Sequence, residues 1–577
     1  MIAKDGGFGV SSTSSASFNL VDEPWIMVRY LDGNTGEVSL LQLLDQMQNI
    51  AQIAGELPTQ DFAVFRTILA IFYRALDIET KADWFECYHD PETVCSDVRE
   101  YLAAMHDRFD LRHPEYPFYQ VPGKGTVCEP GVSLRKLIAD YHNKKQGNEV
   151  YPFFVNRALN GSTKITWAEA ARWLIYVQQF DVGGLHSNLF VDGKKIGGYV
   201  NRGKSGWLGQ IGGMWINREN LYESIFFNLI PTDYFPSSDQ GVEDFPSWET
   251  YEVFWKDSKG NIIDTDRLLK QDRIPQGIIS LLTWQARMVF LDGDDSGVSG
   301  VAIGHKPYLI SGENRFLEPM TTWAISQKDT KISKTAIYRP KRYNPAIQVW
   351  RGLSAILPQI SMSNKVNING VEYRQFRSAL IIEWIHELVS EWKEVSPLID
   401  LRTVGVIFTD SKSSTIETIL NDGVELPKVL LEPERAHLQL FVRDSVKLVD
   451  NVAKAVFVLA SQTSQAAGQS TEEAKAPAED YKRKFYSNVD RDFRQWLKEL
   501  RDPSDQEKLA RYLRRAANDM EQEITESLPT DILFAASRAI NRYRRVVNES
   551  LKNSLLIDLH NNQKGSAAKE KDGRDGK

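Results

Sequence analysis

The chain has 577 residues, of which 42% are hydrophobic and 25% charged, a composition typical of globular proteins with more than one domain. The formal net charge of −8 argues against a protein that coats nucleic acid over its whole surface. Three cysteines are too few for a disulfide framework, and no apolar run approaches the roughly 20 residues of a transmembrane helix. We therefore expect a cytoplasmic protein that does not bind a membrane.

The N-terminal part of the chain mixes strand and helix patterns. Residues 1–17 are rich in glycine and serine and lack the apolar segment of a secretory signal, which predicts a disordered tail. Residues 25–30 and 287–291 are typical of strands. Apolar residues at helical spacing predict helices over residues 60–77 and 168–179.

Because these patterns alternate irregularly and glycine-rich connections are frequent, residues 18–427 are predicted to form a large α+β domain with long loops.

Past residue 432 only helical patterns remain. The apolar stripes are Phe441, Leu448, Val452, Ala455 and Leu459; Phe485, Val489, Phe493, Trp496 and Leu500; Leu509, Leu513, Met520, Ile524 and Leu528; and Leu533, Ala536, Ile540, Val547 and Leu551. A capping box at residues 504–507 is predicted to open the third helix, Pro529 precedes the fourth, and residues 462–478 are expected to be a linker or a frayed helix end. These stripes predict a four-helix bundle over residues 432–561, with a second disordered tail at 562–577.

Four short motifs follow one another in the N-terminal region. They are FNLVDEPWI at residues 18–26, HPEYPFYQ at 113–120, FFVNR at 153–157 and FDVGG at 180–184. In this order, with a helical region behind them, they resemble nucleic-acid-contacting loops of the large subunit of the type I-E Cascade complex, the RNA-guided CRISPR interference machine of prokaryotes. The resemblance extends from about residue 18 to about residue 560.

The resemblance implies a subunit that is not an enzyme and needs no cofactor. In this family the large subunit reads a short flanking motif, the PAM, in double-stranded target DNA, mainly from the minor groove, and helps to start unwinding and R-loop formation. Guide pairing reads the long sequence, while protein loops read the duplex flank. The implied partners are the guide CRISPR RNA, PAM-containing DNA, the backbone, small-subunit and 5′-handle-binding proteins of Cascade, and a helicase–nuclease recruited after R-loop formation.

The resemblance assigns PAM contact to the glycine loop Gly183-Gly184, where the lack of side chains lets the backbone approach DNA. A plain helix stop is the competing interpretation, and both can hold together. Lys306, in the sequence His305-Lys306-Pro307, is the nearest match to the family's PAM-contacting lysine.

Two further segments match loops of the family. Phe154, Val155 and Asn156 resemble the start of a loop that lies near the guide RNA, although Phe154 could instead be a core aromatic residue. Ser411, Lys412 and Ser413 match the position of a wedge hairpin below the PAM. A lysine stands where the family often has glutamine, so a solvated polar turn is the alternative for this segment.

A basic stretch lies between residues 328 and 351. Its members are Lys328, Lys331, Lys334, Arg339, Lys341, Arg342 and Arg351, against the single acid Asp329 and interleaved with Tyr338, Tyr343 and Trp350. Such a stretch fits local contact with a phosphate backbone, through Lys328, Lys331, Lys334, Lys341 and Arg342 in particular. Solvated loops would show the same pattern.

One motif suggests a different class of protein, a P-loop nucleotide-binding enzyme. Residues 198–205, GYVNRGKS, match the Walker A pattern. A true phosphate loop joins an apolar strand to a helix, whereas the preceding residues are polar and the following residues rich in glycine. We therefore regard this function as the alternative to a non-catalytic recognition subunit.

Three patterns that suggest metal binding are incomplete. Residues 292–297 imitate half of an EF-hand loop, but Ile303 stands where calcium requires glutamate, so a tight acidic turn is expected. His386 lacks the second histidine of a zinc-binding helix motif. Cys87 and Cys95 are too far apart for a CxxC pair, and we expect no metal site.

Overall fold

The computed structural model describes most of the chain. The described residues are 17–121, 126–128, 134–139, 143–146, 149–152, 164–184, 189–191, 194–197, 204–235, 243–250, 274–306, 317–341, 344, 347–358, 360, 365–392, 395–409 and 415–572. The fold is α+β, with mixed helices and strands followed by a helical C-terminal region.

The chain divides into two compact units. The first contains residues 1–321, 338–343 and 403–421, and the second contains residues 322–337, 344–402 and 422–577. The second unit is therefore larger than the bundle expected over residues 432–561. Most of residues 322–402, which the sequence analysis placed with the N-terminal domain, belong to the same unit as the C-terminal helices.

The first unit is built around two long, largely buried helices. Its helices are α1 (Leu40–Gln46), α2 (Pro58–Ala75), α3 (Lys81–His89), α4 (Pro91–Ala104), α5 (Trp167–Phe180), α6 (Trp207–Ile211), α7 (Leu221–Asn228) and α9 (Ile278–Leu282). Helices α2 and α5 confirm, within two residues at each end, the helices predicted at residues 60–77 and 168–179. Pro58 pre-sets the first turn of α2, and the Thr166 hydroxyl accepts the Glu169 N–H at the start of α5.

Short sheets surround these helices. The strands are β1 (Ile26–Tyr30), β2 (Thr35–Val38), β3 (Ile50–Ile53), β4 (Thr126–Cys128), β5 (Asn143–Gln146), β6 (Glu149–Pro152), β7 (Leu189–Val191), β8 (Lys194–Gly197), β9 (Gly213–Asn217), β10 (Arg287–Asp294), β11 (Gly297–His305) and β13 (Tyr338–Pro340). The sheet orders include β2-β1-β3, β4-β7-β8, β5-β6 and β10-β11. Strands β1 and β10 match the predicted strands, and β10 extends three residues further, to Asp294.

The hairpin β10–β11 matters most for the site described below. Its register pairs Arg287 with His305 at the open end and Asp294 with Gly297 at the turn. Arg287 and His305 are both fully buried. The hairpin thus places two buried basic side chains next to each other where the strands begin and end.

The second unit combines small elements with four long helices. The elements are β12 (Trp323–Ile325), α10 (Gln327–Ser333), α11 (Leu353–Ile356), β14 (Lys365–Ile368), β15 (Val371–Arg374), β16 (Phe376–Arg377), α13 (Leu380–Glu391), α14 (Ala436–Ala466), α15 (Lys475–Glu499), α16 (Gln506–Glu526) and α17 (Thr530–Asp572). Strands β17 (Leu398–Phe408) and β18 (Ile416–Pro427) each continue from one unit into the other.

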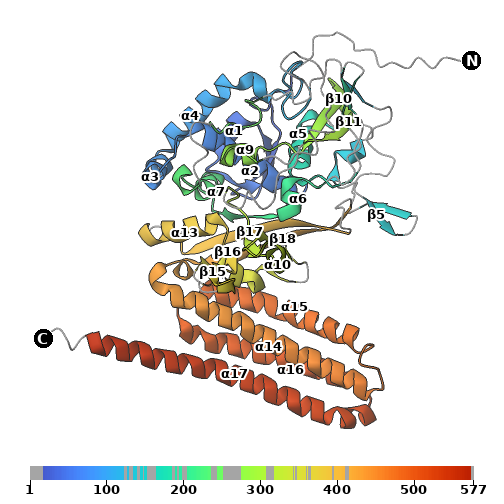
Figure 1. Ribbon diagram of the computed structural model, residues 1–577, viewed down its shortest axis with the longest axis vertical. Helices are drawn as coiled ribbons and strands as arrows, with labels where there is room; N and C mark the ends of the chain where they lie inside the picture. Colours follow the sequence, from blue (N-terminus) through green and yellow to red (C-terminus); the bar gives the residue numbers. More distant parts are fainter. Residues whose placement is uncertain are drawn as a thin grey trace, which may run out of the picture. The chain divides into compact units, whose positions relative to one another are not determined.

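The four long helices α14–α17 lie side by side, and α17 continues past the other three towards the C-terminus (Figure 1). All residues of the first two predicted stripes are buried, as are Leu509, Leu513, Met520 and Ile524 of the third. In the fourth, Leu533 is 37% exposed, which contradicts its predicted place in the core. The stripe on α17 effectively starts at Ala536, because Leu533 lies in the first turn of the helix.

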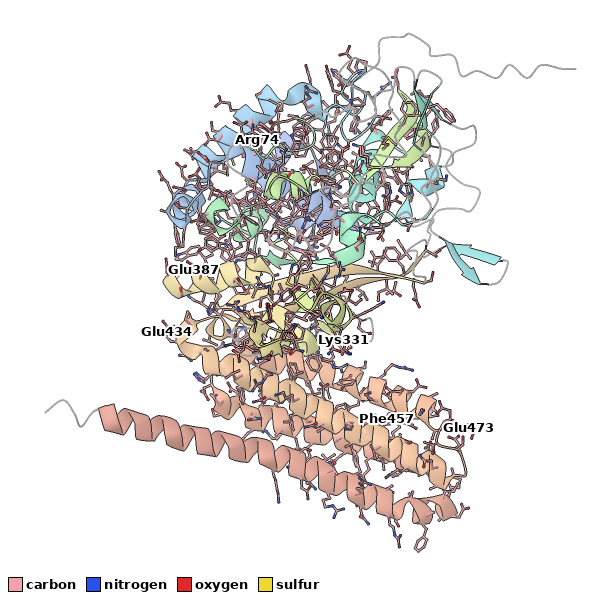
Figure 2. All side chains as sticks on the ribbon, viewed as in Figure 1. Arg74, Lys331, Glu387, Glu434, Phe457 and Glu473 are labelled. Atoms are coloured by element: carbon pink, nitrogen blue, oxygen red, sulfur yellow. The ribbon has the colours of Figure 1, made fainter. Side chains whose placement is uncertain are left out.

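Three predicted helix ends differ from the structure. The linker expected at residues 462–478 is shorter, because α14 continues to Ala466 and α15 begins at Lys475. This connection carries Glu473, whereas Phe457 lies on α14 (Figure 2). Helix α17 continues to Asp572 instead of ending at 561, in a segment rich in the helix-forming residues alanine, lysine and glutamate.

The capping box expected at residues 504–507 is also wrong. The Asp502 carboxylate accepts the Ser504 N–H at 2.8 Å, and the Asp505 carboxylate accepts the backbone N–H of Arg501 at 2.7 Å. Residues Pro503–Asp505 form a short 3-10 turn, and α16 begins only at Gln506. The acidic side chains at 502 and 505 take the capping roles because Pro503 fixes the backbone in the first turn.

Candidate nucleic-acid interface

The glycine loop follows directly from the end of α5. The helix ends at Phe180, and the Asp181 N–H still donates to the Val177 carbonyl at 3.3 Å. Gly184 has φ +104°, a backbone conformation that side chains other than glycine rarely adopt. Helix α5 thus ends before the paired glycines, and Gly184 is needed for the turn itself.

The buried guanidinium group of Arg287 binds this loop from the interior of the unit. Its Nε donates to the Asp181 carboxylate, while Nη2 donates to the carbonyls of Val182 at 2.9 Å and Lys204 at 2.8 Å. The side chains of Arg287 and Asp181 are 0% and 2% exposed. One arginine therefore joins the start of β10, the glycine loop and the segment before α6.

The end of strand β11 adds a second hydrogen bond to the glycine loop and brings Lys306 next to it. The His305 Nε2–H donates to the Gly184 carbonyl at 3.0 Å. The Lys306 N–H donates to the Ala286 carbonyl at 3.1 Å, and its half-buried side chain donates to the Gln285 amide oxygen. The structure thus brings Lys306 to the same place as the glycine loop. The exposed Lys204 belongs there too, because its own carbonyl accepts from Arg287.

The segment that carries Lys204 lies directly against the loop. The Gly206 N–H donates to the Asp181 carbonyl at 2.8 Å. A Cβ at Gly206 would stand 2.4 Å from the carbonyl oxygen of Gln179, so only glycine allows this approach. Gly183, Gly184, Lys204 and Lys306 therefore form one group of residues, which we call the glycine-loop site; Gly183 is buried, so of the two glycines only the half-buried Gly184 reaches the surface.

The second half of the motif at residues 113–120 supports this site from inside the unit, whereas Pro114 and Glu115 in its first half are exposed. Phe118, Tyr119 and Gln120 are buried. The Gln120 side-chain oxygen accepts the Leu291 N–H of β10 at 3.1 Å, and the Val121 N–H donates to Val289 at 2.8 Å. The buried half of the motif thus binds the hairpin that carries Arg287, and contact of the exposed half with nucleic acid stays a prediction.

The motif at residues 18–26 is buried in the same way. Leu20, Val21 and Trp25 belong to the core, and the Leu20 N–H donates to the Phe109 carbonyl at 3.0 Å. The apolar and aromatic residues of this motif pack the first described segment of the chain into the core. The charged Asp22 and Glu23 are exposed.

The residues of the basic stretch fall into two groups. Lys328, Lys331 and Lys334 are exposed on and just after α10 in the second unit (Figure 2 labels Lys331). Lys341 belongs to the first unit, where burial lowers the pKa of its ammonium group. Arg342 lies outside the described residues. The three exposed lysines remain suited to phosphate contact, whereas the half-buried Lys341 is less so.

Two of the aromatic residues interleaved with this stretch, Trp350 and Tyr338, are buried, and Tyr343 lies outside the described residues. Trp350 is fully buried, stacks on Phe493 with ring centroids 4.1 Å apart, and donates its indole N–H to Asp490 at 2.7 Å. Arg351 lies over the Tyr486 ring at 3.6 Å. Tyr338 is buried in the first unit. Neither Trp350 nor Tyr338 offers a stacking surface for bases.

Two predicted contact segments lie outside the described residues: Phe154, Val155 and Asn156 near the guide, and Ser411, Lys412 and Ser413 of the wedge. The strands beside the wedge segment are described. Thr409 donates its N–H to the Thr415 carbonyl at 3.0 Å, which closes a hairpin between the long strands β17 and β18. Hairpin stems are thus present where the wedge was expected.

The Walker-like motif does not sit in a P-loop context. Residues 198–203 lie outside the described part, but both flanks are known. The sequence analysis judged the preceding residues too polar for a central strand and the following glycine-rich residues unsuited to a stable helix; the structure has strand β8 before them and the five-residue helix α6 after them. Strand β8 is an antiparallel edge strand paired with β7, and the Ser205 side chain is buried. A phosphate loop needs a central strand and a longer helix.

The other metal-like patterns are satisfied by protein partners. Lys164 pairs with Asp294 at 2.5 Å and Arg112 with Asp295 at 2.9 Å, so the acidic residues form the tight turn of the β10–β11 hairpin. Lys164 and Ser296 lower the pKa of Asp294. His386 donates from Nδ1 to the Leu431 carbonyl at 2.6 Å. Among the described residues, no cluster of histidine, cysteine or carboxylate side chains could hold a metal ion.

Sequence reasoning missed Asp181 and Arg287 as parts of the site. Asp181 was seen only as a letter of the FDVGG motif, and Arg287 only as the first residue of a strand. The available signal was a charged residue at the start of an otherwise apolar strand, which requires a buried partner. The identity of that partner, 106 residues away, was not visible in the sequence.

Comparison with known proteins gives a consistent result. The family model described as CRISPR-associated protein Cse1 matches residues 19–523. The CasA/Cse1 protein of Thermus thermophilus is 26% identical over 463 residues, covering 78% of this chain and 79% of that protein. The crystal structure of Thermobifida fusca Cse1 is 29% identical with a TM-score of 0.76, covering 93% and 98% of the two chains.

A chain of a CRISPR RNA-guided surveillance complex shares the fold, with 18% identity and a TM-score of 0.64, over 92% of this chain and 99% of that one. Within the described residues, none of the helices is both long and apolar enough to span a bilayer.

Proposed function

The chain belongs to the CRISPR-associated Cse1 family, the large subunit of the type I-E Cascade surveillance complex, and from this premise we propose that it recognises the PAM in double-stranded target DNA. In this role the subunit works without a catalytic step of its own. It helps to start unwinding and R-loop formation, and it recruits the helicase–nuclease. Its further partners are the guide CRISPR RNA and the other Cascade subunits.

One observation carries this proposal: the half-buried Gly184 lies in the same site as Lys204 and Lys306. Gly184 has φ +104°, and its carbonyl accepts the Nε2–H of His305, the residue before Lys306, while the carbonyl of Lys204 accepts from Arg287. A main chain without side chains can reach the minor-groove edge, and lysines neutralise the phosphates on both sides. Because minor-groove readout is degenerate, the subunit should accept several related flanking motifs.

The proposal predicts that Gly184→Asp lowers PAM-specific binding. The variant adds a side chain and a negative charge to a left-handed backbone position that faces DNA. In the assembled complex with guide RNA, affinity for a PAM-containing duplex should fall at least about tenfold, with assembly unchanged. Filter binding or biolayer interferometry on both complexes measures the effect.

Gly33→Asp is the matched control. Gly33 also has a positive φ, +89°, lies exposed in a turn of the same unit, and has open space around its Cα. It should suffer the same backbone strain without loss of DNA affinity. Equal affinity of the Gly184→Asp and Gly33→Asp complexes would remove the glycine loop from the DNA site.

The alternative of a P-loop enzyme is tested with the same preparations. ATP hydrolysis by the wild-type chain that is abolished in Lys204→Ala would contradict the proposed role. We expect no turnover, and a modest, salt-dependent loss of DNA affinity in this variant, as for one phosphate contact.

A further inference from the structure

The contacts below the glycine-loop site point to residues that act on DNA recognition without touching DNA. Four donor–acceptor contacts of Arg287 go to Asp181, Val182, Lys204 and Ala286. A guanidinium group can make them together because its five N–H donors diverge in a fixed plane. A lysine in its place has donors on one atom only and cannot reach these acceptors at once.

Burial of this ion pair is not explained by stability alone. A buried arginine–carboxylate pair often contributes no more stability than well-packed apolar residues of the same size, because both charges lose their hydration. The pair does specify geometry, since every acceptor position is fixed by the guanidinium plane. Here the fixed acceptors are the backbone of the glycine loop and of the segment that carries Lys204.

His305 restrains the same loop from the opposite strand. Its register partner is Arg287, so both side chains leave the hairpin at one level. Arg287 holds the loop at Val182, and His305 holds it two residues later at Gly184. Between these two contacts the loop contains only Gly183, which leaves little freedom for the main chain.

We propose that Asp181, Arg287 and His305 are positioning residues that preorganise the glycine loop and thereby set PAM selectivity. The inference rests on the proposed function of that loop. A loop that is already held in its binding conformation loses less conformational entropy when it binds. This gain in binding free energy applies only to DNA that contacts the loop. The contacts of Asp181, Arg287 and His305 with the loop, which we call the clamp, should therefore raise the affinity for PAM-containing duplex. They should not raise the affinity for duplex without a PAM, which is bound through its phosphates.

Arg287→Lys tests the proposal in the assembled complex, because it keeps the buried charge but cannot hold three segments. We expect about tenfold weaker binding of PAM-containing duplex and a change of less than about twofold for duplex without a PAM. Amide hydrogen exchange of the peptide covering residues 181–184 should also become faster, a readout that general destabilisation of distant elements would not produce.

Arg172→Lys is the matched control, since Arg172, on α5, is also an arginine of the first unit that pairs with carboxylates, and its side chain is only 8% exposed. It donates to Glu37, Glu56 and the Trp25 carbonyl, all away from the glycine loop. It should change neither the ratio of the two affinities nor the exchange of residues 181–184. An equal loss for both duplexes in Arg287→Lys, or an unchanged ratio, would overturn the inference.

The variants separate this inference from the proposed function. The quantity compared is the ratio of the affinity for PAM-containing duplex to the affinity for duplex without a PAM. If Gly184→Asp lowers this ratio and Arg287→Lys does not, the loop binds DNA and the positioning role of Arg287 is refuted. If neither changes the ratio, the role of the loop itself falls. Should Arg287→Lys fail to assemble, His305→Phe keeps a ring of similar size and removes the donor to Gly184. It should lower the ratio by about threefold or more, and an unchanged ratio would again refute the clamp.

Discussion

At the scale of single residues, Asp61 couples stability to pH. Its side chain lies in the first turn of α2 and accepts the Gly55 N–H at 2.6 Å. Burial raises the pKa of Asp61 to about 7, with a further rise from Glu56. The folded chain therefore keeps a proton that the unfolded chain releases near pH 4, and stability falls as pH rises from about 4 to about 7.

Asp61→Asn should remove this loss, because asparagine keeps the acceptor without a charge. The melting temperature of the variant relative to wild type should rise between pH 5 and pH 8, by the equivalent of about 2–3 kcal/mol. Asp83→Asn serves as the contrast: hydrogen bonds from Thr80 lower the pKa of Asp83, so its carboxylate stabilises above pH 4. That variant should lose stability at pH 8 and lose less at pH 3. A pH-independent difference for Asp61→Asn would contradict the prediction.

Residues near one another in sequence were accessible to prediction, and distant pairs were not. Gly183-Gly184 and His305-Lys306 were identified as short patterns, and the structure places both in one site. The Asp181–Arg287 contact depends on how a hairpin packs beneath a helix end, and local sequence carries no record of that packing. Trp350 shows a different limit of prediction. An aromatic residue among lysines can either stack on a base or pack in the core, and Trp350 packs on Phe493.

At the scale of elements, Trp350 joins the segment before α11 to helix α15. Its ring stacks on Phe493 and its N–H donates to Asp490, which also accepts from Arg494. Trp350→Phe should lower the free energy of unfolding by about 2–3 kcal/mol, because volume and a buried hydrogen bond are both lost. Chemical denaturation of the purified chain measures this difference.

Trp323→Phe isolates the contribution of the hydrogen bond. Trp323 is equally buried in the same unit, but its indole N–H has no hydrogen-bond partner among the described residues. Its replacement should cost about 1 kcal/mol less than that of Trp350. Equal losses in the two variants would show that the Asp490 contact contributes nothing.

Helix interiors were more predictable than helix ends. The stripes on α14, α15 and α16 are continuous over several turns, so each misplaced residue would expose apolar surface. The ends depend on a few polar contacts of similar strength. At α16, Asp502 and Asp505 compete successfully with the predicted Ser504–Glu507 box, and at α14 the absence of a strong stop lets the helix continue to Ala466.

At the scale of the whole molecule, the second unit predicts the outcome of truncation after Pro427. The domain boundary predicted between residues 427 and 432 implies that residues 18–427 fold by themselves and stay soluble after such a truncation. Truncation would instead expose Trp350, which packs on Phe493, and remove the carbonyl of Leu431 that pairs with His386. We expect a chain ending at 427 to aggregate or to lose residues 344–402 to protease, as size-exclusion chromatography and limited proteolysis would show. A monodisperse, protease-resistant product would contradict the shared core.

The domain boundary was not predictable because the second unit is discontinuous in sequence. Pattern reading placed a boundary where strand patterns end, near Pro427, since the change from mixed to helical composition is a local signal. The stretch containing Trp350 and α13 has mixed composition but packs with the C-terminal helices. Only its contacts reveal to which unit it belongs.

The same discontinuity has a consequence for synthesis on the ribosome. Crossings at 321/322, 337/338, 343/344, 402/403 and 421/422 take the chain between the units five times. Residues 1–321 can collapse while translation continues, but those at 344–402 must wait until α14 and α15 have emerged, some seconds later at typical elongation rates. During that interval Trp350 and its neighbours are exposed to chaperones and to other nascent chains. Slow codons or a cold shock between residues 402 and 500 should therefore lower the soluble yield more than the same delay placed before residue 321.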